Sequence, residues 1–152
     1  MVQSMARGNA LMINEVNTHQ DGQFIELINL EGNEKTLDSI GLLVVDRVNY
    51  RTLKLRPRML INLSGSVIKR FGLIHFGQLS LESLVTPTLE HRIFYAMGYL
   101  DSNWLQIENT NFISIFLFKD VANAPLANKP KFIDGSLLTF LKQNLLDYVV
   151  IR

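Results

Sequence analysis

The stretch that most constrains the fold is Leu11–Asn29, which reads LMINEVNTHQDGQFIELIN. Two β-type runs, 11–17 and 23–29, flank the dipeptide Asp21-Gly22. This dipeptide tolerates the positive φ angles that tight hairpin turns require. Alternate residues of each run would face opposite sides of the strand. The stretch therefore predicts an antiparallel hairpin near the start of the chain.

Short extended runs separated by turn residues continue along the chain. The segment 42–45 is apolar throughout and predicts a strand buried on both faces. Phe112–Phe118 alternates two apolar faces and is the strongest strand pattern in the sequence. Tyr50–Leu55 alternates charged and apolar residues, which indicates an edge strand. We expect Pro57 to end that strand, because proline has no N–H to donate.

Long helices are not predicted anywhere between these runs. Residues 136–145 indicate one or two helical turns before a last strand at 148–151, and residues 78–102 indicate a long connection. The count is about seven to nine short strands. Short strands without alternating long helices are typical of an all-β antiparallel sandwich or barrel.

The composition supports one globular domain. The chain has 152 residues, of which 47% are hydrophobic and 19% charged, and this excludes a disordered chain. We expect one domain over 10–152, preceded at 1–9 by a flexible segment or an expression remnant. The sequence contains no cysteine, which excludes disulfides, thiolate metal sites and cysteine nucleophiles.

The sequence leaves the compartment open. No run approaches the 18 apolar residues of a membrane-spanning helix, so no transmembrane segment is expected. The first twelve residues lack the apolar core of a signal peptide. Secreted or extracellular and nuclear locations are both compatible with the chain.

Several motifs, taken in order, resemble those of the lamin tail domain. The matching segments in the first half are Ile13–Val16, Gln23–Asn29, Leu37–Val44 and Phe71–Gly77. Those in the second half are Trp104–Gln106, Phe112–Lys119 and Leu145–Val150. The segment 126–142 is longer than in nuclear lamin tails, so the chain is more similar to the secreted-type members. The resemblance implies an immunoglobulin-like β-sandwich and supplies no catalytic residues.

Two groups of residues are candidates for a catalytic or metal-binding site. Glu15 and Glu26 fall on neighbouring strands of the predicted hairpin, where two carboxylates would lie about 5 Å apart. Such a pair suits glycoside hydrolysis or calcium binding, but no second acidic motif accompanies it. His19, His75 and His91 lack the spacing of a metal site. We therefore predict no catalytic, cofactor-binding or metal-binding residues and interpret these side chains as structural.

The feature with most functional weight is a basic stretch between positions 47 and 70. It carries seven cationic residues and no acid: Arg47, Arg51, Lys54, Arg56, Arg58, Lys69 and Arg70. The net charge of the whole chain is only +1, so the stretch is a local feature. We predict that it binds a partner, with an acidic protein surface, an anionic glycan and nucleic acid as the alternatives. A solvated edge strand is the structural alternative.

These observations favour a non-enzymatic interaction or scaffold module. It would bind a protein partner through the loops at 78–102 and 120–136 or through the basic strand edge. Two other functions remain open at this point. One is an accessory binding domain of a secreted or surface hydrolase, and the other is a component of a self-associating structural assembly.

Overall fold

A computed structural model describes residues 10–18, 23–47, 54–77, 112–126 and 132–151, together with the backbone of 89–93. The strands of the first half are β1 (Leu11–Asn17), β2 (Phe24–Asn29), β3 (Lys35–Thr36), β4 (Ile40–Arg47), β5 (Leu55–Asn62), β6 (Val67–Ile68) and β7 (Leu73–Gly77). The remaining elements are β8 (Leu89–Ile93), β9 (Ile113–Lys119), the 3₁₀ helix η2 (Val121–Asn123), α1 (Gly135–Gln143) and β10 (Leu145–Ile151).

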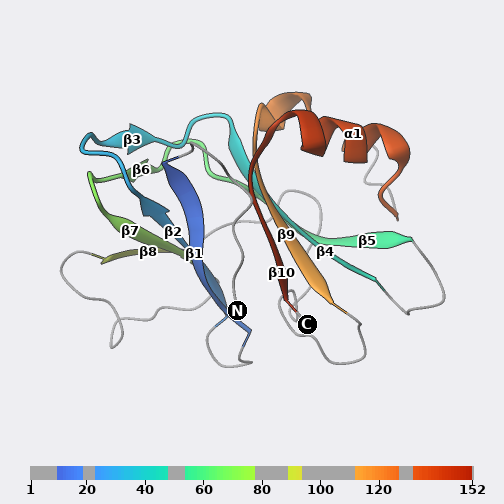
Figure 1. The fold of residues 1–152 in the computed structure, drawn as a ribbon, viewed down its shortest axis with the longest axis horizontal. Coiled ribbons are helices and arrows are strands. Elements are labelled where there is room, and N and C mark those ends of the chain that lie inside the picture. The colour runs from blue at the N-terminus through green and yellow to red at the C-terminus, as the bar shows by residue number, and fades with distance from the viewer. Residues whose placement is uncertain are drawn as a thin grey trace.

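Two four-stranded sheets make up the molecule. Sheet 1 has the strand order β1-β2-β7-β8 and sheet 2 the order β10-β9-β4-β5, while β3 and β6 form a separate two-stranded ribbon. Neighbouring strands are antiparallel except β7 and β8, which are parallel. Figure 1 shows β1 and β10, the edge strands at which the two sheets adjoin, side by side, with α1 lying over sheet 2. The predicted all-β sandwich of short strands is confirmed.

Sheet 2 is buried on both faces. Its inner face meets sheet 1 in the main core, where Leu42 and Val44 of β4 pack with Ile115 of β9. Its outer face packs against α1. The buried Leu137 and Leu141 of the helix form one hydrophobic cluster with residues of sheet 2 and η2, namely Leu43, Val45, Leu60, Phe116, Phe118 and Val121. Because both faces are covered, residues 42–45 of β4 are apolar without interruption and buried, as the sequence predicts.

Helix α1 begins at a capping aspartate. The Asp134 carboxylate accepts hydrogen bonds from the Leu137 N–H at 2.9 Å and from the Ser136 hydroxyl at 2.8 Å. These bonds stabilise the charged form, so the pKa of Asp134 lies below its ordinary value of 3.8, with the Leu137 amide as the main cause. The helix expected at 136–145 is confirmed, although β10 starts at Leu145 rather than at Tyr148.

Two local predictions were wrong. Pro57 does not end a strand but lies inside β5, opposite Val45. Proline is tolerated there because β5 is the edge strand of sheet 2 and is bulged at that point. The expected connection at 78–102 contains the strand β8 at Leu89–Ile93. The predicted turn at 21–22 and strand at 50–55 lie largely outside the described residues.

Gly41 of β4 occupies a position with no room for a side chain. A β-carbon there would lie 2.7 Å from Val121 Cγ2 and 2.8 Å from Phe118 Cζ. We expect Gly41→Ala to lower the free energy of unfolding by about 1–3 kcal/mol in urea titrations, because the core has to shift. Gly135→Ala is the matched control, since a β-carbon at Gly135 would meet no atom within 4 Å. Equal effects of the two substitutions would contradict this packing.

Candidate functional site

Three carboxylates are buried among the described residues: Glu26, Asp46 and Asp147. Each one lies at or beside a β-bulge, where a strand has one residue without a register partner. These unpaired residues are Asn14 in β1, Arg58 in β5 and Leu146 in β10. A bulge interrupts the ladder of backbone hydrogen bonds, and Asp147 supplies acceptors for two backbone amides there, whereas Glu26 and Asp46 accept from side chains.

Glu26 lies on the outer face of sheet 1, because its β2 neighbours Ile25 and Leu27 belong to the core. Its Oε2 lies 2.5 Å from His75 Nε2 on β7, and its Oε1 accepts a hydrogen bond of 2.6 Å from Asn14 Nδ2 at the β1 bulge. The side chains of Glu26 and His75 are 6% and 5% exposed. The carboxylate therefore links three strands; Glu26 and His75 are buried, whereas Asn14 is exposed.

The ring of His75 is fixed from a second direction. It stacks on Phe24 with ring centroids 4.1 Å apart and an angle of 19° between the planes. Glu15 is the register partner of Glu26, but it is exposed, so the two carboxylates of the hairpin differ in environment. Only Glu26 is buried, and it contacts Asn14 and His75 rather than Glu15.

Asp46 lies on the inner face of sheet 2, near the end of β4. Arg56 holds it with two parallel hydrogen bonds, Nε to Oδ1 at 3.0 Å and Nη2 to Oδ2 at 2.8 Å. Arg58 Nε lies 3.6 Å from Oδ2. The side chains of Asp46 and Arg58 are 0% and 5% exposed, whereas that of Arg56 is 43% exposed. One buried acid therefore pairs with two members of the basic stretch.

Asp147 joins the two sheets where β1 and β10 meet. Its Oδ2 accepts a hydrogen bond of 2.7 Å from the Ile13 N–H, and its Oδ1 accepts one of 2.7 Å from the Tyr148 N–H. Both β1 and β10 are edge strands of their sheets. The carboxylate thus accepts the hydrogen bond of an edge-strand N–H in sheet 1. Without it, this N–H would be available for pairing with a strand of another chain.

The basic stretch separates into two regions at opposite ends of β4. Arg47, Lys54 and Arg56 lie at the end where β4 leads towards β5, and we call these three residues the basic end. The Arg47 guanidinium lies 5.0 Å from the centroid of the Phe112 ring, and Lys54 Nζ lies 5.2 Å from that of Phe132. Both are cation–π contacts, which restrict the two side chains. Arg58 is buried beside this region and presents little surface.

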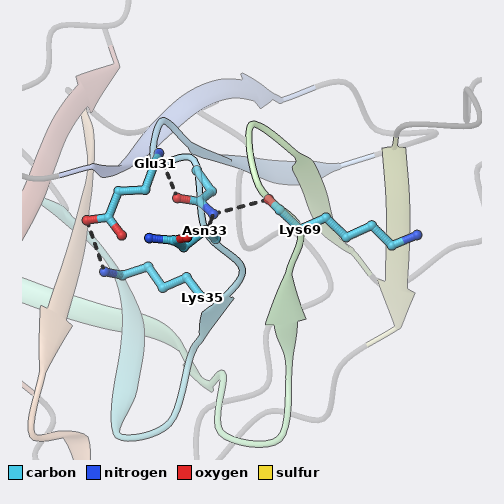
Figure 2. A network of polar contacts seen from close by, with 5 residues as sticks. Glu31, Asn33, Lys35 and Lys69 are labelled. Carbon is cyan, nitrogen blue, oxygen red and sulfur yellow. Dashed lines mark hydrogen bonds and ion pairs between the residues drawn. The ribbon is translucent and has the colours of Figure 1, made fainter.

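Lys69 and Arg70 are exposed at the far end, in the turn between β6 and β7. Ile68, just before this turn, pairs with Lys35 of β3 ahead of β4, whereas Arg47 of the basic end lies at the last position of β4. The buried Asn29 fixes this turn, donating to the Asn33 and Lys69 carbonyls at 2.8 and 3.1 Å. Figure 2 shows the Lys69 side chain extending away from the Glu31–Lys35 pair. Arg51 lies outside the described residues.

Strand register brings together two histidines that the sequence treats as independent. His91, expected in a loop, lies in β8 as the register partner of His75, and His75 is the register partner of Glu26. Positions 26, 75 and 91 therefore form one row across β2, β7 and β8. The sequence spacing of these three residues does not predict the row, because the row depends on how β2, β7 and β8 pair. His19 lies outside the described residues.

Within the described ranges, no three histidine or carboxylate side chains cluster closely enough to hold a metal ion. No helix in the same ranges is long and apolar enough to cross a membrane. The predicted loop at 78–102 is described only at β8, and within 120–136 the chain forms η2 and the start of α1. The described parts of the fold therefore leave the basic end as the most developed candidate for partner binding.

Comparison with known proteins adds no assignment. No model of a known protein family matches the chain, and no curated protein shows significant similarity to it.

Proposed function

We propose that this chain is a non-enzymatic interaction module of the lamin-tail type, which binds an acidic protein partner through the basic end. The observation that carries the proposal is the fixed geometry of three cations at one end of sheet 2. Arg47 and Lys54 rest on aromatic rings, and Arg56 is held by Asp46 while 43% of its side chain stays exposed. Cations that are ordered beforehand lose less side-chain entropy on binding.

The composition of the basic end favours protein over nucleic acid. Arginine and aromatic residues are enriched at the centres of protein interfaces. Nucleic acid binding relies instead on a broad basic stripe that contacts many phosphates. Here Asp46 partly neutralises Arg56 and Arg58, and Lys69 and Arg70 lie in a separate turn between β6 and β7.

Self-association through the edge of β5 has less support. Pro57 and the bulge at Arg58 interrupt the edge, and Ile133 N–H donates to the Leu55 carbonyl at 2.8 Å. Bulges, prolines and covering segments are devices that prevent edge-to-edge pairing. The neighbouring basic end is therefore a better docking surface than the ladder itself.

Charge reversal tests the proposal. A fluorescent twelve-residue polyglutamate peptide serves as the probe in anisotropy titrations, and we expect the double variant Arg47→Glu/Lys54→Glu to bind it at least tenfold more weakly. A tenfold loss corresponds to about 1.4 kcal/mol, a reasonable sum for two interfacial charges. Lys119→Glu is the matched control, because Lys119 is exposed at the opposite end of the same sheet. It should change the affinity less than twofold.

Two outcomes would overturn the assignment. One is an equal loss in the Lys119→Glu control, since this would show attraction to net charge alone. The other is tighter binding of a heparin oligosaccharide or a single-stranded DNA oligonucleotide than of the peptide, with the same dependence on Arg47 and Lys54. That result would replace the acidic protein partner with an anionic polymer.

A further inference from the structure

We propose that the end of sheet 1 beside the β2–β3 and β6–β7 turns is a dimerisation surface, and that its partner is a second copy of this chain. The surface, which we call the apolar tip, consists of Met12, Ile28, Leu30, Phe71 and Leu73. Phe71 and Leu30 are 67% and 49% exposed, and they are the only exposed large hydrophobic residues in the described part of the chain. The basic end lies on sheet 2, so this inference does not depend on the function proposed above.

Strand register assembles one side of the apolar tip. Met12, Ile28 and Leu73 form a row of register partners across β1, β2 and β7. They lie on the outer face of sheet 1, because their chain neighbours Leu27 and Ile74 belong to the main core. Each of the three is half-buried and belongs to neither hydrophobic core. The row is therefore an apolar strip at the surface of the sheet.

Leu30 and Phe71 continue this strip into the two turns. The Asn29 N–H donates to the Gly72 carbonyl at 3.0 Å, and the Phe71 N–H donates to the Glu31 carbonyl at 3.1 Å. These two hydrogen bonds lie on either side of Leu30 and join the β2–β3 turn to the β6–β7 turn. Half-buried and exposed apolar side chains thus adjoin at one place, as is typical of protein interaction sites.

The backbone of Phe71 is strained in a way that an interaction would explain. Its φ angle is 50°, in the left-handed region that bulky residues rarely adopt. Glycine would suit this position, but the glycine of the turn is needed at the next one. A β-carbon at Gly72 would lie only 2.8 Å from the Lys69 carbonyl oxygen. The turn therefore holds an aromatic residue at a strained and exposed position.

Charged residues of opposite sign flank the apolar tip on its two sides. Lys69 and Arg70 are exposed in the β6–β7 turn, and Glu31 and Glu34 are exposed in the β2–β3 turn. Figure 2 shows the Lys69 side chain extending away from Glu31. Among the described residues, Lys69, Arg70 and Glu34 take part in no ion pair, and Glu31 has only a contact of 3.9 Å with the partly exposed Lys35. These charges can therefore pair with a partner.

This arrangement of charges favours a second copy of the chain as the partner. A twofold rotation about the apolar tip brings the cationic side of each copy against the acidic side of the other. The same rotation buries Phe71 and Leu30 of both copies. A partner with charges of one sign would leave one side of the tip opposed by like charges, and an anionic membrane would repel Glu31 and Glu34.

The first test is sedimentation velocity of the untagged full chain at about 1–200 µM, a range that covers micromolar dissociation constants. We expect the monomer to convert to a dimer as the concentration rises. Phe71→Asn should raise the dimer dissociation constant at least tenfold and keep the fold, because asparagine tolerates a positive φ. Lys119→Glu is the matched control, since Lys119 is exposed on sheet 2, and it should change the constant less than twofold.

Reciprocal charge reversal then identifies the two sides that meet. The double variants Lys69→Glu/Arg70→Glu and Glu31→Lys/Glu34→Lys should each dimerise at least tenfold more weakly than the unsubstituted chain. An equimolar mixture of the two should form a heterodimer with a dissociation constant within threefold of the original. In this heterodimer every charged side again meets one of opposite sign.

Four results would overturn the proposal. They are a monomer at all concentrations, unchanged dimerisation in Phe71→Asn, an equal loss in Lys119→Glu, and failure of the two charge-reversed variants to associate in the mixture. Binding of the monomeric chain to phosphatidylserine vesicles, abolished by Phe71→Asn, would replace the second copy with a membrane surface. Thermal melting of each variant shows that it is folded, and recovery in the mixture itself requires both variants to be folded.

Discussion

Replacement of Asp46 by alanine is expected to lower the free energy of unfolding by about 3–5 kcal/mol, the largest effect of any single substitution considered. The reason is the environment of Arg58, whose side chain is 5% exposed and loses the carboxylate 3.6 Å from its Nε. Arg56 loses its two hydrogen bonds to the same carboxylate, but it reaches solvent. Urea titrations monitored by circular dichroism measure the change.

A double-mutant cycle separates the buried charge from other effects. Arg58→Met removes the guanidinium and keeps a long apolar side chain at the bulge. The double variant Asp46→Ala/Arg58→Met should therefore lose less stability than the sum of the two single variants. Glu34→Ala, at an exposed acid, should change stability by less than about 0.5 kcal/mol. Full additivity in the cycle would contradict the proposed pairing of Asp46 with Arg58.

Asp147→Ala is expected to lower the free energy of unfolding by about 2–4 kcal/mol. The substitution removes the acceptors of two amides, Ile13 N–H and Tyr148 N–H, at the place where the two sheets meet. Asp147 is completely buried, so water does not readily replace the carboxylate. Each buried donor left without an acceptor is destabilising by about 1–3 kcal/mol.

Glu15→Ala is the control for this second substitution. Glu15 lies on β1, two residues from Ile13, but its side chain is exposed. Its removal should change stability by less than about 0.5 kcal/mol. Similar losses in Asp147→Ala and Glu15→Ala would show that the contact between the sheets does not depend on the carboxylate.

Hydrophobic pattern predicted the parts of the fold that depend on local sequence. The run at 42–45 and the alternation at 112–118 correspond to β4 and β9, the two central strands of sheet 2. Their pattern is informative because burial on both faces favours apolar residues on both sides of a strand. The hairpin pairing of β1 with β2 follows from the same period-two pattern.

The bulges and the strand register were not predictable in this way. Asn14, Arg58 and Leu146 look like ordinary strand residues, and only the pairing with a neighbouring strand leaves them unmatched. The burial of Arg58 is therefore not predictable from its sequence pattern. Asp46 directly precedes the basic stretch, so the pattern also does not show that it partly neutralises the stretch. Likewise, the distance of sixteen positions from His75 to His91 conceals their neighbouring places in sheet 1.

The buried carboxylates and the basic end have separate roles in this account. Asp147 accepts hydrogen bonds from two backbone amides beside the bulges of β1 and β10, whereas Glu26 and Asp46 accept from side chains of neighbouring strands. Asp46 also holds Arg56 at 2.8 Å, which under the proposed function orients it toward an acidic partner. Substitutions of the acids should thus mainly lower the free energy of unfolding. Substitutions of Arg47 and Lys54 should weaken binding with little change in the free energy of unfolding.

Native-state hydrogen exchange at the Ile13 amide tests the central claim most directly, because this N–H lies at a bulge and its acceptor is Asp147. In the unsubstituted protein, the Ile13 amide should exchange as slowly as core amides such as that of Leu27. In Asp147→Ala, its exchange should accelerate at least tenfold more than that of Leu27. Free exchange of the Ile13 amide in the unsubstituted protein, or equal acceleration at both amides, would contradict the role given to the buried carboxylate.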